Sequence, residues 1–366
     1  MELIVFCFFG TYELYSNPYW HKKKTMNLYL FPAAPTNVGG YNIAVLADYK
    51  RLKPNENDVT VWNQDTLPNW VPRKNAHLFK PVSIKSMKAI SRMMQGRFSQ
   101  EFSEDELEFL KGQQFEEIFC DEVIFYRAIR KLYPEKKLTV RFHNLFFRIL
   151  VRNQILKIKT DWRFEGKLRI LSKLEKAIFE DENVQKVFIT EEDALFYQAI
   201  MSKSDYEVWD FKPDMDLMEQ NRKPIRIAHK LIWFGGLESH KTLSVKWLTE
   251  KVLPQIQTVH PDTELHLYGG GTKQFNSPAR KVFGHGYYHG DGLPMRNEAL
   301  YVNPDILGGG VKIKLLTYFN EGVPFISSPY GFEGYDKTLI DNTYCSVVEE
   351  ANWTDYIIHY FNTYSK

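Results

Sequence analysis

The chain has 366 residues, of which 44% are hydrophobic and 25% charged, so it has a globular balance and is long enough for two ordinary domains. A net charge of +2 is too small to indicate nucleic-acid binding. The three cysteines are far apart, which excludes a disulfide framework and is typical of a reducing compartment. The longest apolar run is far shorter than the ~20 residues that cross a bilayer. We therefore expect a soluble, cytoplasmic protein.

Strands and helices alternate along the first half, an order typical of parallel α/β domains. The expected strands lie at 27–31, 58–62, 117–120, 138–142 and 186–189. The first strand runs into a turn-rich loop that contains Gly39 and Gly40, followed by an expected helix at 41–52. Thr190 and the three acidic residues after it have the pattern of an N-cap and first turn, which predicts a helix from there to about Met201.

The second half alternates in the same way and more regularly. The expected strands lie at 227–234, 264–268, 281–283, 299–303, 323–327 and 344–348. The expected helices lie at 243–259, 311–320 and 352–364. The pattern predicts a second parallel sheet with helices on its faces.

These elements divide the chain into two Rossmann-like domains of similar size. We expect a first domain at 26–208 and a second at 225–350, joined by a linker at 209–224 that lacks apolar periodicity. Residues 1–25 are expected to be an extension or an extra strand. Residues 351–366 are expected to form a helix that crosses back to the first domain.

Glycines follow three of the expected strands in the second domain. The clusters are Gly235-Gly236, Gly269-Gly270-Gly271 and Gly308-Gly309-Gly310, the last running into Val311 and Lys312. Ligands of open parallel sheets bind at the carboxyl ends of the strands, where glycine lets backbone N–H groups approach a phosphate. Tight turns alone would also explain each cluster. Neither the dinucleotide-binding fingerprint nor the P-loop pattern is present, which disfavours those two nucleotide sites.

Residues 232–334 resemble the donor-binding half of GT-B glycosyltransferases, especially the retaining family 4. The likeness starts with Phe234-Gly235-Gly236-Leu237 and Lys241, and it ends with Gly322-Val323-Pro324 and Phe332-Glu333-Gly334. It implies a GT-B fold, with two Rossmann-like domains facing each other across a cleft. It also implies a nucleotide diphosphate sugar as donor, transfer with retention of configuration, and no metal ion.

The chain departs from the family pattern at three positions. The two glutamates that family 4 enzymes usually carry correspond to Gly309 and Thr317, and a common arginine corresponds to Gly236. The contacts to the donor sugar and ribose are therefore missing or differently supplied, and Glu333 is a candidate to supply them.

Lysines are the cations that remain for the diphosphate. We expect Lys241 and Lys312 to bind it, because lysine acts on phosphate as a point charge. Lys314 is an equally good candidate for the diphosphate and for a solvated helix surface.

His143 is the main candidate in the first domain. It ends an expected strand, between Arg141 and Asn144, and the resemblance implies a hydrogen-bonding role at the transferred sugar. We expect Arg141 and Asn144 to contact the acceptor. The loop with Gly39 and Gly40 resembles the one that approaches the donor phosphate in this fold, although a simple turn explains it almost equally well.

Two further patterns suggest metal sites and are interpreted differently. His285 and His289 are separated by glycine and have no evident third ligand, so we assign His285 to a loop that holds the nucleotide base. Asp214-Met215-Asp216 mimics the D-x-D motif of another glycosyltransferase fold, but it lies in the expected linker and no strand precedes it.

The segment 143–176 is basic, with apolar residues such as Phe146, Ile149 and Trp162 between the basic ones. Such a segment can lie on an anionic membrane, although an amphipathic helix with a solvated face explains it slightly better.

The sequence therefore predicts a glycosyltransferase that moves a sugar to a saccharide or glycolipid hydroxyl in surface polysaccharide or glycan assembly. Two alternatives stay open: an epimerase or phosphorylase of the same fold, and a degenerate, non-catalytic partner subunit.

Overall fold

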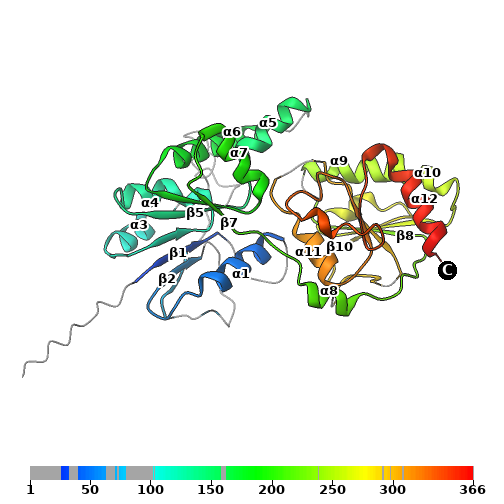
Figure 1. Ribbon diagram of the computed structural model, residues 1–366, viewed down its shortest axis with the longest axis horizontal. Coiled ribbons are helices and arrows are strands. Elements are labelled where there is room, and N and C mark those ends of the chain that lie inside the picture. Colours follow the sequence, from blue (N-terminus) through cyan, green and yellow to red (C-terminus); the bar gives the residue numbers. More distant parts are fainter. Residues whose placement is uncertain are drawn as a thin grey trace, which may run out of the picture.

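The protein forms two α/β units that lie side by side, each built on one parallel sheet (Figure 1). The computed structural model describes residues 26–32, 40–62, 71, 74–79, 102, 104–157, 162–237, 239–290, 292–296, 298–306 and 309–365. The expected extension at 1–25 and the glycines Gly39 and Gly308 lie outside these ranges.

The first sheet has seven strands in the order β3-β2-β1-β4-β5-β6-β7, all parallel. Its strands are β1 (Leu28–Phe31), β2 (Val59–Trp62), β3 (Ala76–Leu78), β4 (Ile118–Cys120), β5 (Leu138–Phe142), β6 (Val184–Phe188) and β7 (Tyr206–Val208). The helices of this unit are α1 (Gly40–Leu52), α3 (Glu104–Lys111), α4 (Tyr126–Leu132), α5 (Phe146–Ile155), α6 (Trp162–Glu180) and α7 (Glu191–Met201).

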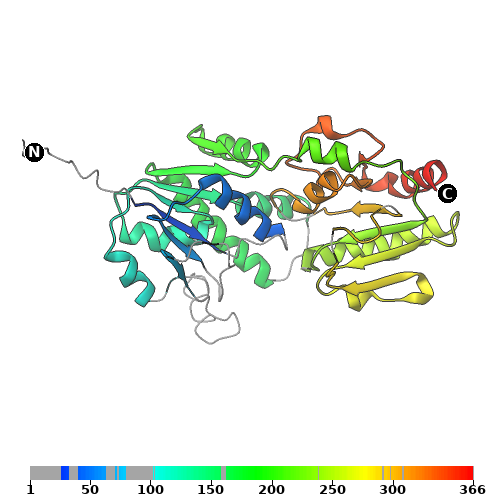
Figure 2. The same cartoon turned by 90° about the horizontal axis from the view of Figure 1, so that it is seen from below.

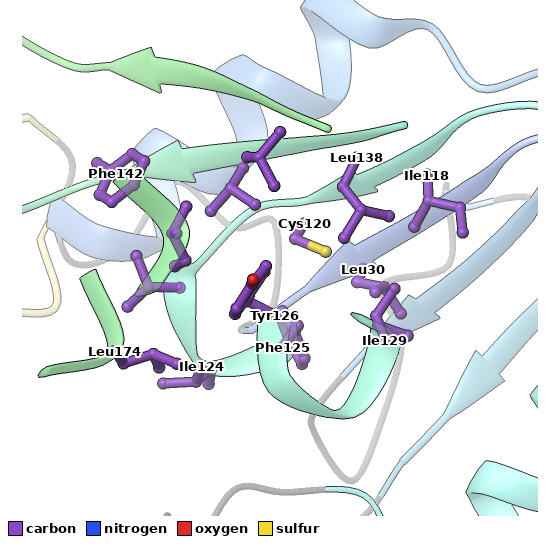
Figure 3. Packing of buried hydrophobic residues seen from close by; sticks show 14 of the residues in the cluster. Leu30, Ile118, Cys120, Ile124, Phe125, Tyr126, Ile129, Leu138, Phe142 and Leu174 are labelled. Carbon is purple, nitrogen blue, oxygen red and sulfur yellow. The ribbon is translucent and has the colours of Figure 1, made fainter. Parts of the chain in front are cut away.

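The central strands β1, β2 and β4 are buried along their whole length, as expected for a parallel sheet covered on both faces. In β1, Leu28 and Leu30 point to one face and Tyr29 and Phe31 to the other, as the period of two requires. Figure 3 shows one face, where residues of β1, β4 and β5 pack against α4, α6 and the short turn before α4.

The second sheet has six strands in the order β10-β9-β8-β11-β12-β13, again all parallel. Its strands are β8 (Lys230–Phe234), β9 (Glu264–Tyr268), β10 (Val282–Gly286), β11 (Leu300–Asn303), β12 (Phe325–Ser327) and β13 (Cys345–Val347). The helices of this unit are α8 (Met215–Asn221), α9 (Ser239–Trp247), α10 (Leu253–Gln257), α11 (Ile313–Asn320) and α12 (Trp353–Tyr364).

Both sheets reverse their strand order at one point, between β1 and β4 in the first and between β8 and β11 in the second. Loops that leave such neighbouring strands run in opposite directions and open a crevice at the carboxyl edge, which is where doubly wound sheets bind ligands. The loops after β1, β4, β8 and β11 are therefore the places to look for a site.

Every expected strand is present, two of them with the predicted bounds, and the expected helix at the Thr190 cap is confirmed. The Thr190 hydroxyl accepts a hydrogen bond from the Asp193 N–H at 3.0 Å. The short edge strands β3 and β7 were not predicted. Between the sheets, α8 occupies part of the expected linker and packs on α11.

The expectation that the last helix crosses back to the first domain is wrong. Residues Trp353, Ile357, Tyr360 and Phe361 of α12 are buried in the core of the second unit, and α12 packs on α10. It lies at the far side of that unit from the first one (Figures 1 and 2). No helix among the described residues is long and apolar enough to cross a bilayer.

We predict that Gly269→Ala destabilises the second unit. Gly269 has a φ of +127°, and a Cβ there would lie 1.9 Å from the Gly235 carbonyl oxygen, so the loops after β8 and β9 would have to separate. The expected loss is about 2–4 kcal/mol of unfolding free energy. Urea unfolding followed by tryptophan fluorescence measures it.

Gly236→Ala is the matched control, because a Cβ there has open space and its φ lies outside the left-handed range. Its effect should stay within about 0.5 kcal/mol. Equal stability of the two variants would contradict the close contact between the loops.

Candidate functional site at the interface of the two units

The glycine turns after β8 and β9 meet at the carboxyl edge of the second sheet. The Gly235 N–H donates to the Tyr268 carbonyl at 2.9 Å, and the Leu237 N–H donates to the Gly270 carbonyl at 2.8 Å. The absence of a side chain at Gly269 permits this approach. Two of the three predicted glycine clusters therefore form one surface of backbone.

A buried aspartate anchors lysines at the same edge. Asp305 follows β11 and is 1% exposed, and its Oδ2 lies 2.9 Å from the Nζ of Lys314. Burial alone would raise the pKa of Asp305, but the charges of Lys314, Lys312 and Lys241 together lower it below its ordinary value. The three predicted lysines thus act on one carboxylate. The sequence reasoning gave Asp305 no role, although its place directly after a strand was a usable signal.

Lys312 is the N-cap residue of α11 and is buried. Its Nζ donates to the carbonyls of Gly309 and Gly310 at 3.3 and 3.0 Å, and it lies 4.7 Å from the centre of the Tyr330 ring. Burial lowers the pKa of Lys312 to about 8. These three partners of the Lys312 ammonium are neutral, so they stabilise its positive charge without cancelling it.

The third glycine turn touches the first unit. Gly310 has a φ of +58°, and a Cβ there would lie 2.3 Å from the His143 carbonyl oxygen. A Cβ on Gly309 would lie 2.6 Å from Cδ1 of Ile149 and 2.9 Å from Oδ1 of Asn144. The interface therefore brings Gly309 and Gly310 together with His143 and Asn144, which the sequence analysis had assigned to different domains.

His143 lies at the carboxyl edge of the first sheet, just after β5. Its Nε2 is 3.0 Å from Oδ1 of Asp121, which follows β4, and 4.0 Å from Oδ2 of Asp48 in α1. All three side chains are buried. Burial lowers the pKa of His143, so the imidazole is neutral at pH 7 and the Asp121 carboxylate can fix which ring nitrogen carries the hydrogen.

Arg141 lies beside this cluster and is fully buried. Its Nε donates to Oδ2 of Asp48 at 3.1 Å, and its other two nitrogens donate to the carbonyls of Phe188 and Trp209. Each of the three guanidinium nitrogens therefore makes one contact inside the first unit. The expected contact between Arg141 and the acceptor stays a prediction.

Asp48, Asp121 and His143 form the one group of three potential metal ligands found among the described residues, with ligand atoms within 4.8 Å of one another. Arg141 already places a positive charge on the Asp48 oxygen that a metal would need. Burial raises the pKa of Asp48 to about 6 and also raises that of Asp121, so both carboxyls give up their protons less readily than an ordinary aspartate. The expected absence of a metal stays a prediction.

Glu333 bridges the two units. Its carboxylate pairs with Arg148 and with Arg152 of α5, the latter at 3.1 Å. Arg152 also lies 4.1 Å from the centre of the Tyr330 ring, on which Lys312 stacks as well. The sequence predicted a contact between Glu333 and the donor sugar, and it could not reveal these two arginines, which lie some 180 residues away.

The other predicted residues are spread around this centre. Gly40 begins α1, Val311 is buried beside Lys312, and Thr317 is half-buried in α11. His285 lies on the edge strand β10, where its Nε2 is 3.0 Å from Nδ1 of His266 and its ring stacks on Tyr268 at 4.3 Å. Asp214 of the Asp214-Met215-Asp216 pattern is the N-cap of α8, where its side chain accepts a hydrogen bond from the Leu217 N–H.

Several solved structures share this two-unit fold over nearly the whole chain. Sucrose-phosphate synthase from Thermosynechococcus elongatus matches with a TM-score of 0.59 and 14% identity, covering 92% of this chain and 90% of its own. A glycosyltransferase from Rickettsia africae matches with a TM-score of 0.53 and 13% identity, covering 93% and 88%. HepE from Anabaena, crystallised with UDP, matches with a TM-score of 0.54 and 10% identity, covering 93% and 89%.

These neighbours are GT-B glycosyltransferases, so the chain has the GT-B fold and the predicted fold class is confirmed. The likeness does not single out family 4. No protein-family model and no curated protein matches the sequence.

We predict that wild-type protein loses stability between pH 4 and 6 relative to Asp48→Asn. The pKa of Asp48 is raised on folding, so the folded state holds a proton that the unfolded state has released in this window. That contribution is fully present below pH 4 and is lost as the pH rises through about 6. The amide of the variant cannot titrate. Urea unfolding at pH 4.5 and 7 measures the difference, and parallel pH profiles would contradict it.

Proposed function

We propose that the protein is a glycosyltransferase that moves a sugar from a nucleotide diphosphate sugar to a hydroxyl of a saccharide or glycolipid. The observation that carries the proposal is the group of lysines around Asp305, at the switch point of the second sheet and next to the His143 loop of the first. A diphosphate needs such a group of cations and backbone N–H groups.

The charge at the interface favours an anionic ligand. Lys241, Lys312 and Lys314 face one carboxylate, Asp305, and burial has already weakened the hold of Lys312 on its proton. A diphosphate bound there would restore the charge balance. The same cations would stabilise the negative charge that builds on the leaving diphosphate during transfer, with no metal required.

His143 supplies a neutral hydrogen-bonding group on the opposite wall. We assign it to a hydroxyl of the transferred sugar, with Asn144 next to it on the acceptor side. Transfer with retention follows from the family resemblance, and NMR of the anomeric proton in the first-formed product tests it. We further propose a cytoplasmic role in surface polysaccharide or glycan assembly.

One observation favours a non-catalytic role for the protein. The position of the first family glutamate is Gly309, where any side chain would meet Ile149 and Asn144. A glutamate there would require the Ile149 and Asn144 side chains to move. Glu333, held by Arg148 and Arg152, is the carboxylate that we propose to face the donor sugar or ribose instead.

We expect the protein to release nucleoside diphosphate from at least one member of a panel of nucleotide sugars when a saccharide acceptor is present. Chromatography of the nucleotides measures release, and the same runs detect an epimerised donor or a sugar phosphate formed with added phosphate. Thermal stabilisation without turnover would favour the non-catalytic partner. Neither binding nor turnover with any nucleotide would overturn the transferase proposal.

We also expect proton uptake when a nucleoside diphosphate binds at pH 8.5, because an anion beside Lys312 raises a pKa that now lies near 8. Calorimetry in buffers of different ionisation enthalpy measures this uptake. Lys312→Met should abolish it and weaken binding about 10–100-fold.

Lys246→Met is the matched control, since Lys246 is an exposed lysine on α9. It should leave both proton uptake and affinity unchanged. Uptake that persists in Lys312→Met would remove Lys312 from the diphosphate site.

A further inference from the structure

Two helices of the first unit form a hairpin that reaches away from the rest of the protein. α5 and α6 pack along each other, and α6 starts shortly after α5 ends. The last turn of α5 and the first turn of α6 therefore lie at the same end of the pair. The end of α5 projects beyond the rest of the first unit (Figure 1).

This end of the hairpin exposes large apolar side chains. Ile155 is 72% exposed, Leu156 is 56% exposed and Trp162 is 76% exposed. Single exposed hydrophobic residues are common on soluble proteins, whereas a group of this size at one projecting end indicates a contact surface. We call Ile155, Leu156 and Trp162 the hairpin tip.

Exposed basic side chains lie at the hairpin tip and along α6. Lys157 directly follows Leu156, and Lys167 and Lys173 are exposed along α6. Their exposed acidic neighbours are fewer, and Glu165 is already paired with Arg169. A second copy of the chain would bring lysines against lysines, while an anionic lipid surface would accept the tryptophan and aliphatic side chains and attract the lysines.

The remainder of α5 lies at the interface of the two units. Arg148 and Arg152 pair with Glu333, and Ile149 approaches Gly309. A helix of this length spans roughly 15 Å. One short helix thus connects the hairpin tip to the candidate site.

We propose that the hairpin tip docks on an anionic membrane surface and that the acceptor is a saccharide carried by a membrane lipid. The acceptor half of this inference rests on the proposed function, whereas the docking half does not. Because α5 connects the tip to the interface of the two units, docking through the tip would hold that interface about one helix length from the lipid headgroups, within reach of the sugar of a lipid-linked saccharide.

Co-sedimentation of the full chain with vesicles tests the docking half. We expect binding to vesicles that mix phosphatidylcholine and phosphatidylglycerol, little binding to phosphatidylcholine alone, and weaker binding at high salt. The double variant Ile155→Ser/Trp162→Ser should lose about tenfold in partition to the anionic vesicles. Val259→Ser, at a half-exposed valine of the second unit, should bind like wild type.

The lysines have a separate test. Lys167→Glu/Lys173→Glu should weaken binding to the anionic vesicles and reduce its salt dependence. The control Lys246→Glu/Lys251→Glu, in the second unit, should change neither. Circular dichroism checks that each variant is folded. Failure of wild type to bind the anionic vesicles, or equal binding by the tip variant, would overturn the proposal.

Light scattering tests whether the tip binds a second copy of the chain instead of a membrane. A dimer of wild type that dissociates in Ile155→Ser/Trp162→Ser, without vesicle binding, would assign the tip to a second copy and overturn the proposal.

Activity measurements separate this inference from the proposed function. Donor hydrolysis without vesicles should be the same in wild type and in the tip variant, because the tip lies outside the site. Wild type should transfer faster to a vesicle-embedded lipid-linked saccharide than to the free saccharide, and the tip variant should lose that gain. Vesicle binding without any donor turnover would leave the docking surface standing and overturn the function.

Discussion

The contact on which the site depends is one of backbone against backbone. Gly310 of the second unit approaches the His143 carbonyl so closely that a Cβ would have to sit 2.3 Å from its oxygen. Gly309 beside it is less constrained, because a Cβ there would meet only the side chains of Ile149 and Asn144. Because Gly310 has no side chain, the lysines at the edge of one sheet and the histidine at the edge of the other can share one interface.

Buried charge is the second feature that the two units have in common. Asp305 pairs with Lys314 in one, and Asp48 pairs with Arg141 in the other, each near the carboxyl edge of its sheet. Buried ion pairs stabilise a fold weakly, because removing the charges from water costs about as much as their attraction returns. Their concentration at the edges that face each other therefore points to a site, where shifted pKa values are useful, more than to a structural need.

Much of the fold could be predicted because the strands are short runs rich in apolar residues that alternate with helical segments. β5 (Leu138–Phe142) and β9 (Glu264–Tyr268) were predicted to the residue, although Arg141 and His266 interrupt their apolar runs. The strands β3 and β7 are three-residue edge strands with exposed positions, so they carry no such signal. The apolar spacing in α12 showed that the helix is buried, but a spacing does not say which sheet buries it.

Some residues of the candidate site could be predicted from local sequence patterns, and others could be found only from the folded structure. Glycines after strands and the lysine beside them are local patterns, and the sequence revealed them. The partners of Glu333 and of His143 are not local. Asp121 reaches His143 once β4 and β5 pair in the first sheet, and Arg148 reaches Glu333 only when the two units meet. Tyr330 also depends on both units, because Lys312 of its own unit and Arg152 of the first unit both make cation–π contacts with its ring. A cation from each unit on one ring, next to a carboxylate shared by two arginines, means that the charge at this site is set by the pair of units and by neither alone.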